Sequence, residues 1–509
     1  MEAPKYYLTT PIYYVNDVPH IGHAYTTLAC DALARFMRLD GFDVLFLTGT
    51  DEHGQKVEKA AEALKMEPQA FTDKVSKNFR DLLPFMNISN DDFIRTTEDR
   101  HKVSAQAIWR RLMQNGHIYL DKYSGWYSVR DEAYFAENEL IDGNAPTGAP
   151  VEWVEEPSYF FDLSKWQTKL LEFYDENPDF IAPVSRRNEV ISFVSSGLRD
   201  LSISRTSFNW GIAVPEDEKH IMYVWLDALT NYITATGFPD EQKMLYRKFW
   251  PASLHMVGKD ILRFHAVYWP AFLLAAGLEP PKRVFAHGWW TNEGQKISKS
   301  LGNVIDPIEL VDTYGLDQVR YFLLREVPFG NDGDFSKSAM INRINSDLSN
   351  DLGNLCQRVL SFVQKNCDAS IPLNNGLSGE DNRLIAHAYE VLPNLRTDFN
   401  SQSFNVALER IWGIVSASNK YIDEQAPWKL RKTEPERMKT VLFTLLETIR
   451  CIGIVLQPVM PTSANEILNQ LSVDPSDRSF SALNGEHRLQ SGAKLQLPSP
   501  IFPRFDEKT

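Results

Sequence analysis

The chain has 509 residues, 43% of them hydrophobic, with 53 Lys and Arg against 67 Asp and Glu and a net charge of −14. Because a single hydrophobic core stops growing near ~250–300 residues, this length predicts several domains. Aromatic residues make up 12% of the chain, which excludes a disordered protein. The acidic balance excludes indiscriminate polyanion binding, although a local basic patch can still bind nucleic acid.

Nothing in the sequence is typical of a membrane or exported protein. No run of ~18 residues lacks charge, and residues 1–5 lead directly into a strand-like segment without a signal or transit peptide. The cysteines are scattered and do not form a disulfide framework. They are Cys30, Cys356, Cys367 and Cys451. These features predict a cytoplasmic protein with reduced thiols.

The first fifty residues predict a strand–helix–strand unit. Residues 6–10 are aromatic and β-branched and predict a strand that runs into the loop at 11–16. After Pro19, apolar residues at helical spacing predict an amphipathic helix, and residues 44–47 predict a buried strand that ends at Gly49. Parallel strands joined by a crossover helix indicate a doubly wound sheet, whose ligand crevice lies beyond the carboxyl ends of the strands.

The same pattern returns after a long interruption. Residues 254–257 predict a strand, 261–276 a helix and 284–287 another strand. Between the two halves, residues from about 116 to 225 are rich in aromatic, Gly, Pro and acidic residues at irregular spacing, which predicts an insertion of short strands and turns. The fold class is therefore α/β, a split Rossmann-like doubly wound parallel sheet with an inserted connective domain.

The last third of the chain predicts a C-terminal α-helical bundle. Apolar residues from 341 to 362 follow steps of three and four, as one long amphipathic helix should. A polar linker at 368–380 precedes further helical segments around 381–399 and 404–424. A capping box at residues 433–436 predicts the start of another helix.

Two short motifs carry the candidate chemistry, and the first is H-I-G-H at residues 20–23. It lies where the first strand's loop enters the helix, at the helix end whose free N–H groups favour anions. His20 and His23 share a helical face and can donate hydrogen bonds to phosphate oxygens, while Gly22 lets a base or phosphate approach the backbone. Taken alone, the motif is better explained by two histidines that cap a helix.

The second motif is K-I-S-K-S at residues 296–300, after a strand and a Gly-containing loop. Two ammonium groups and two hydroxyls within five residues suit a triphosphate. A solvated basic loop is the common explanation of a single Lys-rich pentamer. Both motifs in this order, on strand-edge loops of one split α/β domain, favour a phosphate site.

The pair of motifs resembles the HIGH and KMSKS signatures of class I aminoacyl-tRNA synthetases, with Ile297 in place of the usual Met. Further segments resemble the methionyl branch of that family, and the resemblance covers nearly the whole chain. They are residues 11–16 (P-I-Y-Y-V-N), 50–54 (T-D-E-H-G), 223–228 (Y-V-W-L-D-A) and 258–260 (G-K-D). The resemblance implies a methionine–tRNA ligase, which forms methionyl-adenylate and pyrophosphate and then charges the 3′ end of its tRNA.

By this resemblance, methionine binds in an aromatic, apolar pocket in which Asp51 binds the α-ammonium. A thioether contacts aromatic ring edges favourably, and an uncompensated carboxylate in an apolar crevice would be costly. The implied methionine-binding residues are Ile12, Tyr14, Asp51, Trp225, Ala228, Leu229, Tyr232, Ile261 and His265; Leu229 stands where some members carry Pro. Ile261 and His265 are four apart on the predicted helix and would share a face. For Trp225 and Tyr232 alone, core packing is the better explanation.

The resemblance also implies the ATP site and its chemistry. The implied ATP-binding residues are His20, Gly22, His23, Gly258, Asp260, Lys296, Ser298, Lys299 and Ser300. The catalytic candidates His20, His23, Lys296 and Lys299 would stabilise charge on the phosphates, and Asp260 would hold the ribose hydroxyls. Mg²⁺ would accompany ATP, and the lysines would close over the triphosphate on a mobile loop.

The helical bundle resembles the anticodon-reading surface of the family through Asn354, Arg358 and Trp428. Trp428 offers a stacking face for an unpaired base, and Asn354 and Arg358 lie one helical turn apart. A polar helix face explains the latter two nearly as well. The expected partners are tRNA(Met) including initiator tRNA, L-methionine and ATP, with no membrane. The chain ends without an appended tRNA-binding barrel, which predicts a monomer.

The resemblance divides the chain into five parts. The expected parts are 1–115, first half of the Rossmann catalytic domain; 116–225, inserted connective domain; 226–290, second half of the catalytic domain; 291–345, KMSKS-loop and stem-contact region; and 346–509, helical anticodon-binding domain. Many relatives carry paired C-x-x-C zinc knuckles in the insertion, whereas this insertion contains no cysteine. We therefore expect no structural zinc.

Three other functions compete with this interpretation. A small-molecule nucleotidylyltransferase could share the phosphate site and the sheet but would not need a helical bundle of this size. A non-catalytic tRNA-binding protein would have no reason to keep both phosphate motifs. A cysteine-activating synthetase is the nearest rival, and it would be expected to hold the substrate thiolate with zinc ligands that are absent here.

Overall fold

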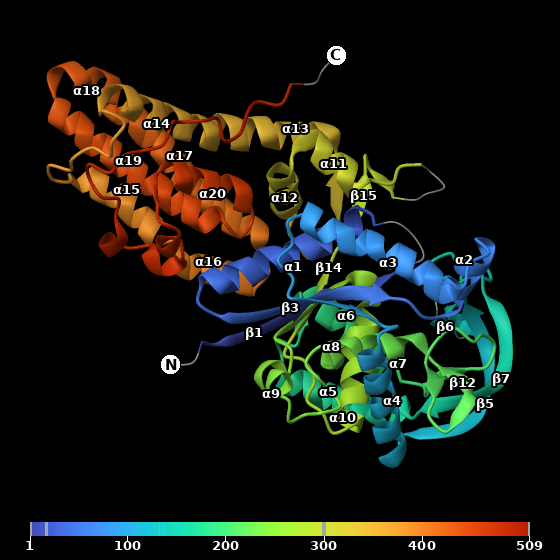
Figure 1. Cartoon of the computed structure of the whole chain (residues 1–509). Helices are drawn as coiled ribbons and strands as arrows, with labels where there is room; N and C mark the ends of the chain where they lie inside the picture. The colour runs from blue at the N-terminus through green and yellow to red at the C-terminus, as the bar shows by residue number, and fades with distance from the viewer. Residues whose placement is uncertain (1–2, 16–18, 132, 136, 298–301, 507–509) are drawn as a thin grey trace. The chain divides into compact units, whose positions relative to one another are not determined.

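The computed structural model describes residues 3–15, 19–131, 133–135, 137–297 and 302–506 (Figure 1). The chain forms two compact units. The sheet unit comprises residues 4–19 and 44–287, and the bundle unit comprises residues 1–3, 20–43 and 288–509. The expected domain boundaries divide the chain differently, because they place residues 20–43 with the first half of the sheet; those boundaries stay a prediction.

A parallel sheet lies at the centre of the sheet unit. Its strand order is β2-β3-β1-β13-β14-β8, with β4 paired to β3. The strands are β1 (Lys5–Thr9), β2 (Tyr13–Tyr14), β3 (Asp43–Asp51), β4 (Asp92–Arg95), β8 (Ile181–Ala182), β13 (Leu254–Gly258) and β14 (Val284–His287). β1 runs parallel to β13, β13 to β14, β14 to β8, and β3 to both β2 and β4. This arrangement confirms the predicted doubly wound α/β fold.

Helices pack against this sheet. They are α2 (Gln55–Ala63), α3 (Pro68–Phe85), α4 (Asp99–Gln114), α5 (Gln167–Glu176), α6 (Val184–Ser195), α7 (Val224–Leu229), α8 (Asn231–Thr234), α9 (Met244–Phe249) and α10 (Trp269–Ala275). Strand residues such as Leu47 and Val257 share one buried core with helix residues such as Trp109 and Phe272. Strands buried on both faces read as continuous apolar runs, which is why residues 44–47 were recognisable in the sequence.

The inserted segment contains longer strands than the sequence predicts. β5 (Ile118–Ser128) and β7 (Glu152–Phe161) pair antiparallel, flanked by β6 (Ala133–Phe135) and β9 (Leu201–Ser202). A second small sheet joins β10 (Ser204–Arg205), β12 (Asp217–Met222) and β11 (Ala213–Val214). The prediction of short strands and turns is wrong here, because Gly125 and Pro157 lie inside the paired strands although both residue types usually mark turns.

The inserted segment also contributes to the main sheet. Residues 163–195 form a short 3₁₀ turn, α5, β8 and α6, and β8 pairs with β14. Gly125 lies inside β5, which continues through Ser128.

We expect the purified, tag-free protein to contain well under one zinc per chain by elemental analysis, with no loss of melting temperature on chelation. The only histidines of the insertion, His117 and His220, are engaged elsewhere. His117 Nδ1 lies 3.1 Å from Asp162 Oδ1, and His220 Nδ1 lies 2.9 Å from Ser204 Oγ. Tetrahedral zinc needs four converging thiolate or imidazole ligands. Stoichiometric zinc that leaves together with activity would contradict this expectation.

The bundle unit is built from helices and one small sheet. Its elements are α1 (Ile21–Leu39), β15 (Trp290–Asn292), β16 (Gln295–Lys296), α11 (Pro307–Tyr314), α12 (Leu316–Arg325), β17 (Gly333–Phe335), α13 (Lys337–Arg343), α14 (Asn354–Asn366), α15 (Gly379–Tyr389), α16 (Leu392–Asn400), α17 (Phe404–Gln425), α18 (Pro427–Thr433), α19 (Pro435–Leu456) and α20 (Pro461–Gln470). The long helices α14, α17 and α19 pack together (Figure 1). This confirms the predicted C-terminal helical bundle.

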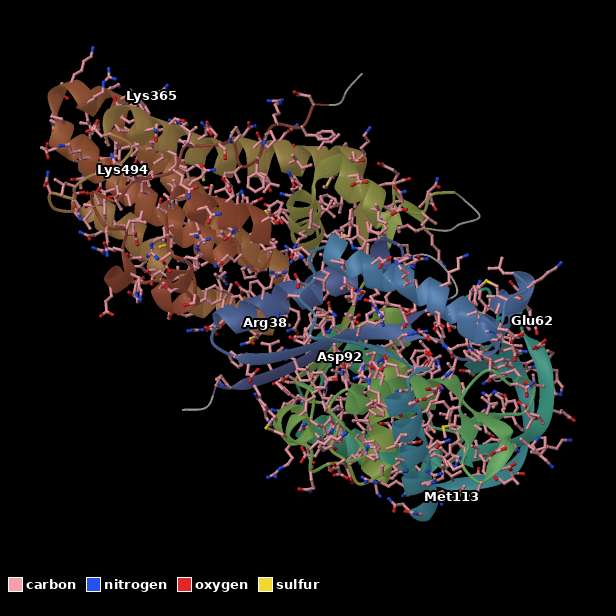
Figure 2. The ribbon with its side chains drawn as sticks, viewed as in Figure 1. Arg38, Glu62, Asp92, Met113, Lys365 and Lys494 are labelled. Carbon is pink, nitrogen blue, oxygen red and sulfur yellow. The ribbon has the colours of Figure 1, made fainter. Side chains whose placement is uncertain are left out.

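Helix α1 packs within the bundle unit along its whole length. Near its start, the Tyr25 ring meets Trp290 of β15 edge to face at 5.5 Å, and near its end Phe36 stacks on Phe399 of α16 at 4.0 Å. Arg38, which complements the helix dipole, lies in the last turn (Figure 2). The helix that starts at the H-I-G-H motif is therefore held by the C-terminal part of the chain.

Three predicted helices differ in detail from the structure. The segment predicted as a helix at 261–276 contains a π-helical turn, Phe264–Tyr268, before α10. The long helix predicted at 341–362 contains a π-helical stretch, Ile344–Gly353, between α13 and α14. The predicted capping box at Thr433 is wrong, because that residue ends α18 and Glu434 precedes α19 without a side-chain cap.

In the part of the chain that the structure describes, no helix combines the length and the apolarity needed to cross a bilayer. All four cysteines are free, and three of them are buried.

Candidate active site

The edge of the main sheet brings Tyr14 and Asp51 side by side. Parallel β2 and β3 place these two residues at the same register position. Asp51 is only 3% exposed and is the last residue of β3, which runs two residues beyond the end at Gly49 that the sequence predicts. A buried carboxylate at the carboxyl end of a parallel strand points to a cationic ligand in the crevice.

Aromatic rings pack together where α7 meets the π-helical turn Phe264–Tyr268. Trp225 of α7 stacks on Phe264 with ring centroids 3.7 Å apart and planes at 4°. The His265 ring meets Trp225 edge to face at 6.0 Å. Phe264 was not among the residues predicted from the sequence, although its position between the predicted residues Ile261 and His265 could have indicated it.

His265 is held in one tautomer. Its Nδ1 lies 2.9 Å from the carbonyl oxygen of Ile261 and therefore donates, so that Nε2 accepts from the Tyr232 hydroxyl at 2.7 Å. Burial lowers the pKa of His265 to about 4, although the bond to Ile261 opposes this shift. The ring is neutral at pH 7, and it packs against the uncharged rings of Trp225 and Tyr232.

The predicted methionine residues all belong to the sheet unit, and His265 contacts three of them: Trp225, Tyr232 and Ile261. Trp225, Leu229 and Tyr232 belong to the buried core of that unit, and Ile12, Tyr14 and Ile261 pack against the same core. Ala228 is buried on α7 next to them in the chain. The predicted shared face of Ile261 and His265 holds, but through a 3₁₀ and a π turn rather than one regular α-helix.

Both histidines of the H-I-G-H motif cap α1, as the simpler explanation of the motif required. His20 Nδ1 accepts from the Gly22 amide at 3.0 Å, and His23 Nδ1 accepts from the His20 amide at 3.2 Å. The two rings stack at 3.8 Å. Burial, and then the neighbouring His20 ring, lower the pKa of His23 well below its usual value.

The capping geometry also decides where the imidazole protons lie. Because Nδ1 accepts in both rings, a neutral His20 or His23 carries its proton on Nε2. The two Nε2–H groups are donors at the N-terminus of a helix, where anions bind well. Gly22 is required by the cap itself, since a Cβ there would lie 2.9 Å from His20 Cε1. Capping and phosphate binding are therefore compatible roles.

The bundle unit ties the first phosphate motif to the described segment that follows the second. The Ile21 amide donates to the carbonyl of Ile305 at 3.1 Å, which ties the start of α1 to the segment after the K-I-S-K-S motif. Lys296 is exposed at the end of β16, with its ammonium 5.9 Å from the Trp289 ring centroid. Asn303 donates to the Lys296 carbonyl at 3.1 Å and so joins the two ends of the intervening loop. Ser298, Lys299 and Ser300 lie outside the described residues.

Gly258 and Asp260 form a close pair at the end of β13 in the sheet unit. A Cβ at Gly258 would lie 2.5 Å from Asp260 Oδ1, so any larger residue would displace the carboxylate. Glycine at this position thus preserves the place of the predicted ribose-binding group.

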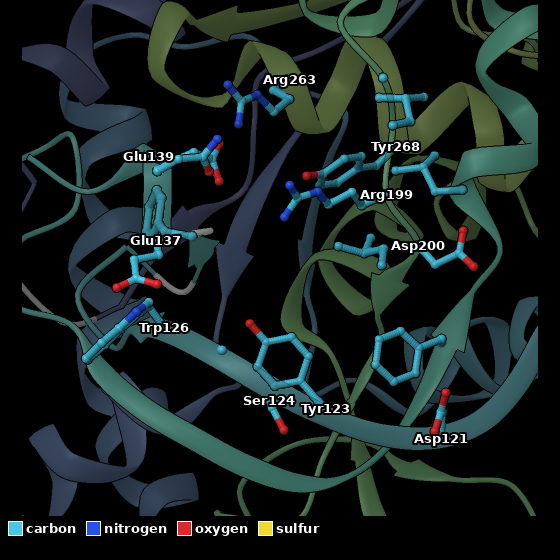
Figure 3. Close-up of a pocket in the computed structure, with 18 of the residues that line it drawn as sticks. Asp121, Tyr123, Ser124, Trp126, Glu137, Glu139, Arg199, Asp200, Arg263 and Tyr268 are labelled. Atoms are coloured by element: carbon cyan, nitrogen blue, oxygen red, sulfur yellow. The ribbon is translucent and has the colours of Figure 1, made fainter.

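A cavity of about 870 Å³ also lies in the sheet unit, between β5, β7, the chain after α6 and the π turn (Figure 3). Arg263 and Tyr268 line it, whereas His265 of the same segment bonds to Tyr232. Of the described residues that line this cavity, none is a predicted methionine- or ATP-binding residue. The predicted methionine- and ATP-binding residues that the structure describes therefore lie outside this cavity.

In the bundle, the predicted anticodon residues gather on α14 and α18. The Arg358 guanidinium lies 5.5 Å from the centroid of the Trp428 ring and donates to Asp423 at 2.8 Å. Trp428 is 42% exposed, an unusual position for so large an apolar side chain, and Asn354 is exposed one turn earlier on α14. An exposed aromatic face beside a guanidinium suits single-stranded RNA.

Comparison with known proteins gives one family over the whole chain. The family model "tRNA synthetases class I (M)" matches residues 6–152 and 147–360, and the model "Anticodon binding domain of methionyl tRNA ligase" matches residues 371–509. The chain is 62% identical to the methionine–tRNA ligase of Rickettsia felis over 98% of both chains, and 54% identical to that of Mesorhizobium japonicum over 100% of this chain and 99% of that one.

The fold matches a solved structure equally well. The Mycobacterium tuberculosis methionyl-tRNA synthetase in complex with methionyl-adenylate is 53% identical, with a TM-score of 0.96 over 98% of this chain and 100% of that one. The chain therefore belongs to the methionyl family of class I tRNA synthetases.

Proposed function

We propose that this chain is a methionine–tRNA ligase, which activates methionine with ATP and transfers it to the 3′ end of its tRNA. The observation that carries the proposal is a buried carboxylate, Asp51, in register with Tyr14, which packs against the core that contains Trp225 and Tyr232. A carboxylate suits an ammonium, and aromatic rings suit a thioether. The function of the relatives and the adenylate in the Mycobacterium tuberculosis complex support it.

The first step forms methionyl-adenylate. A carboxylate oxygen of methionine attacks the α-phosphorus of ATP, and the bond to the pyrophosphate oxygen breaks, so that pyrophosphate leaves with the electron pair. No covalent protein nucleophile is needed, only positioning and charge stabilisation. The Nε2–H groups of His20 and His23 donate to phosphate oxygens, and Lys296 and Lys299 place compact positive charges on the triphosphate. Asp260 holds the ribose hydroxyls.

The second step charges the tRNA. A hydroxyl of the terminal ribose attacks the carbonyl carbon of the adenylate, an ester bond forms, and AMP leaves. Asp51 and the aromatic pocket hold the methionyl group through both steps, which keeps the reacting carbonyl in place.

We also propose that Mg²⁺ accompanies ATP. Mg²⁺ bound to substrate phosphates neutralises charge on the triphosphate. Among the residues described, no group of three or more His, Cys, Asp or Glu could hold a metal ion, so the phosphates would supply its ligands. A cytoplasmic, monomeric enzyme is part of the same proposal, and the four free cysteines support a reducing location.

Methionine-dependent ATP–pyrophosphate exchange tests the function directly. Exchange should be strongest with methionine among the amino acids, and tRNA(Met) should then be charged. Preference for cysteine would favour the rival cysteine-activating synthetase. Under the mechanism above, charging requires the adenylate, so charging of tRNA without exchange would contradict that mechanism.

We expect Trp428→Ala to reduce aminoacylation of tRNA about ten- to a hundredfold while methionine-dependent exchange stays intact. Losing one stacked base costs ~1–3 kcal/mol, and Trp428 presents an exposed face for such a base. Steady-state charging of tRNA(Met) measures the effect, and Trp428→Phe is the control that keeps a stacking ring. If charging and exchange fell together, Trp428 would be a structural residue.

A further inference from the structure

The strand that carries Asp51 is joined to α7 by a buried hydrogen-bonded chain. Asp227 lies between two imidazoles: His53 Nδ1 is 2.7 Å from Oδ2, and His101 Nε2 is 2.6 Å from Oδ1. His53 is 3% exposed, and the other two are fully buried. Burial alone would raise the pKa of Asp227, but the two histidines hold it down at about 2. The carboxylate is ionised, so each ring donates to it.

The three side chains come from three separate elements of the sheet unit. His53 follows Asp51 by two residues, His101 lies on α4, and Asp227 lies on α7 between Trp225 and Ala228. One chain of hydrogen bonds therefore connects the segment directly after β3, α7 and a sixteen-residue helix.

The residues around His53 are held as well. The Glu52 carboxylate accepts from Arg95 Nε at 2.7 Å and from Nη2 at 2.9 Å. The His53 ring meets Trp210 edge to face at 5.5 Å. Positions 52 and 53, directly after Asp51, are therefore both held by side-chain contacts, and the His53–Asp227 bond ties this segment to α7.

Stability alone does not account for the buried hydrogen bonds between His53, Asp227 and His101. A buried ion pair loses its hydration, and well-packed apolar residues of the same volume are often as stable or more so. A directional bond from His53 to Asp227 gives something that apolar packing does not, namely a fixed distance between the strand end and α7. A fixed distance matters for a ligand that must contact both.

We propose that the His53–Asp227–His101 chain is a specificity-determining element, which selects amino acids by side-chain length by fixing the distance from Asp51 to the pocket wall on α7. The inference rests on the proposed function, in which Asp51 binds the ammonium and the wall binds the thioether. One extra or missing methylene in a well-fitted apolar pocket changes kcat/KM by roughly 10–200-fold. Loosening the chain should reduce that discrimination.

Exchange rates with methionine, with ethionine (one methylene longer) and with homocysteine (without the terminal methyl) test the proposal. His53→Leu keeps the bulk but loses the donor, and it should lower the methionine-to-ethionine ratio of kcat/KM about tenfold or more. His53→Asn places an amide N–H where Nδ1 lies and should retain most of the ratio. The KM for ATP should stay unchanged in both variants.

His117→Leu is the matched control, because it also removes a His–Asp bond of the sheet unit. It should leave the ratios of kcat/KM between methionine, ethionine and homocysteine unchanged, even if the melting temperature falls. Should His53→Leu fail to fold, Asp227→Asn, which keeps the shape and loses the charge, decides the question through the same ratios.

If the folded variants kept the wild-type ratios of kcat/KM between amino acids while activity on all of them fell in parallel, the inference would be overturned. The His53–Asp227–His101 hydrogen bonds would then have a structural role only. If the wild-type protein showed no methionine-dependent exchange at all, the proposed function would fail, and the inference with it. The two failures are distinguished by the wild-type measurement alone.

Discussion

Replacing Asp51 with Asn is expected to lower kcat/KM for methionine by roughly 30- to 3,000-fold while the KM for ATP changes little. Asp51 is 3% exposed at the end of β3, and removing one partner of a buried charge pair costs about 2–5 kcal/mol. The isosteric amide keeps the shape of the site. Methionine- and ATP-dependent exchange kinetics, measured separately, give the two parameters.

The Asp51→Asn result discriminates between two roles of the carboxylate. An ammonium anchor loses methionine affinity selectively, because the amide no longer compensates the positive charge. A carboxylate that only supports the fold would instead lower the melting temperature and weaken ATP and methionine together. Asp162→Asn, which alters a nearly buried carboxylate elsewhere in the sheet unit, should leave both KM values unchanged.

The strands of the main sheet could be predicted because their sequences follow the apolar pattern of strands that are buried on both faces. Residues 44–47 are continuously apolar, as a strand covered on both faces must be, and 254–257 and 284–287 repeat the pattern except for one buried histidine in each, His255 and His287. The insertion was not predictable in the same way. Gly125 and Pro157 lie within paired strands, where tertiary pairing outweighs the local preference of these residues for turns.

The π-helical turns were also beyond the sequence. A π turn adds one residue to a helical turn and keeps the 3-and-4 spacing of apolar positions nearly intact, so periodicity does not reveal it. At Phe264–Tyr268 the extra residue lies in the candidate site itself, where Phe264 stacks on Trp225 and His265 bonds to Tyr232. Such turns occur often at functional sites.

Motif resemblance pointed to the residues proposed to contact ligands but not to all the residues that hold them in place. Asp51 and Trp225 were found because their segments resemble the family. His101 lies outside every segment that carried the resemblance, and its link to Asp227 spans 126 positions. A hydrogen bond between residues so far apart leaves no local pattern in one sequence.

Replacing Lys299 with Ala is expected to slow adenylate formation about 10²–10³-fold with little change in methionine binding. Removing one preorganised group that acts on developing charge has an effect of this size, and an ammonium that acts mainly in the transition state lowers the rate more than the affinity. Lys299 itself lies outside the described residues. The described residues on either side of it are joined, because the Asn303 side chain donates to the Lys296 carbonyl at the end of β16.

Stopped-flow adenylate formation and equilibrium methionine titration measure the two quantities. Lys365→Ala, on the exposed surface of α14, is the control. An unimpaired forward rate in the Lys299 variant would show that the K-I-S-K-S motif is the solvated basic loop that a single pentamer would suggest.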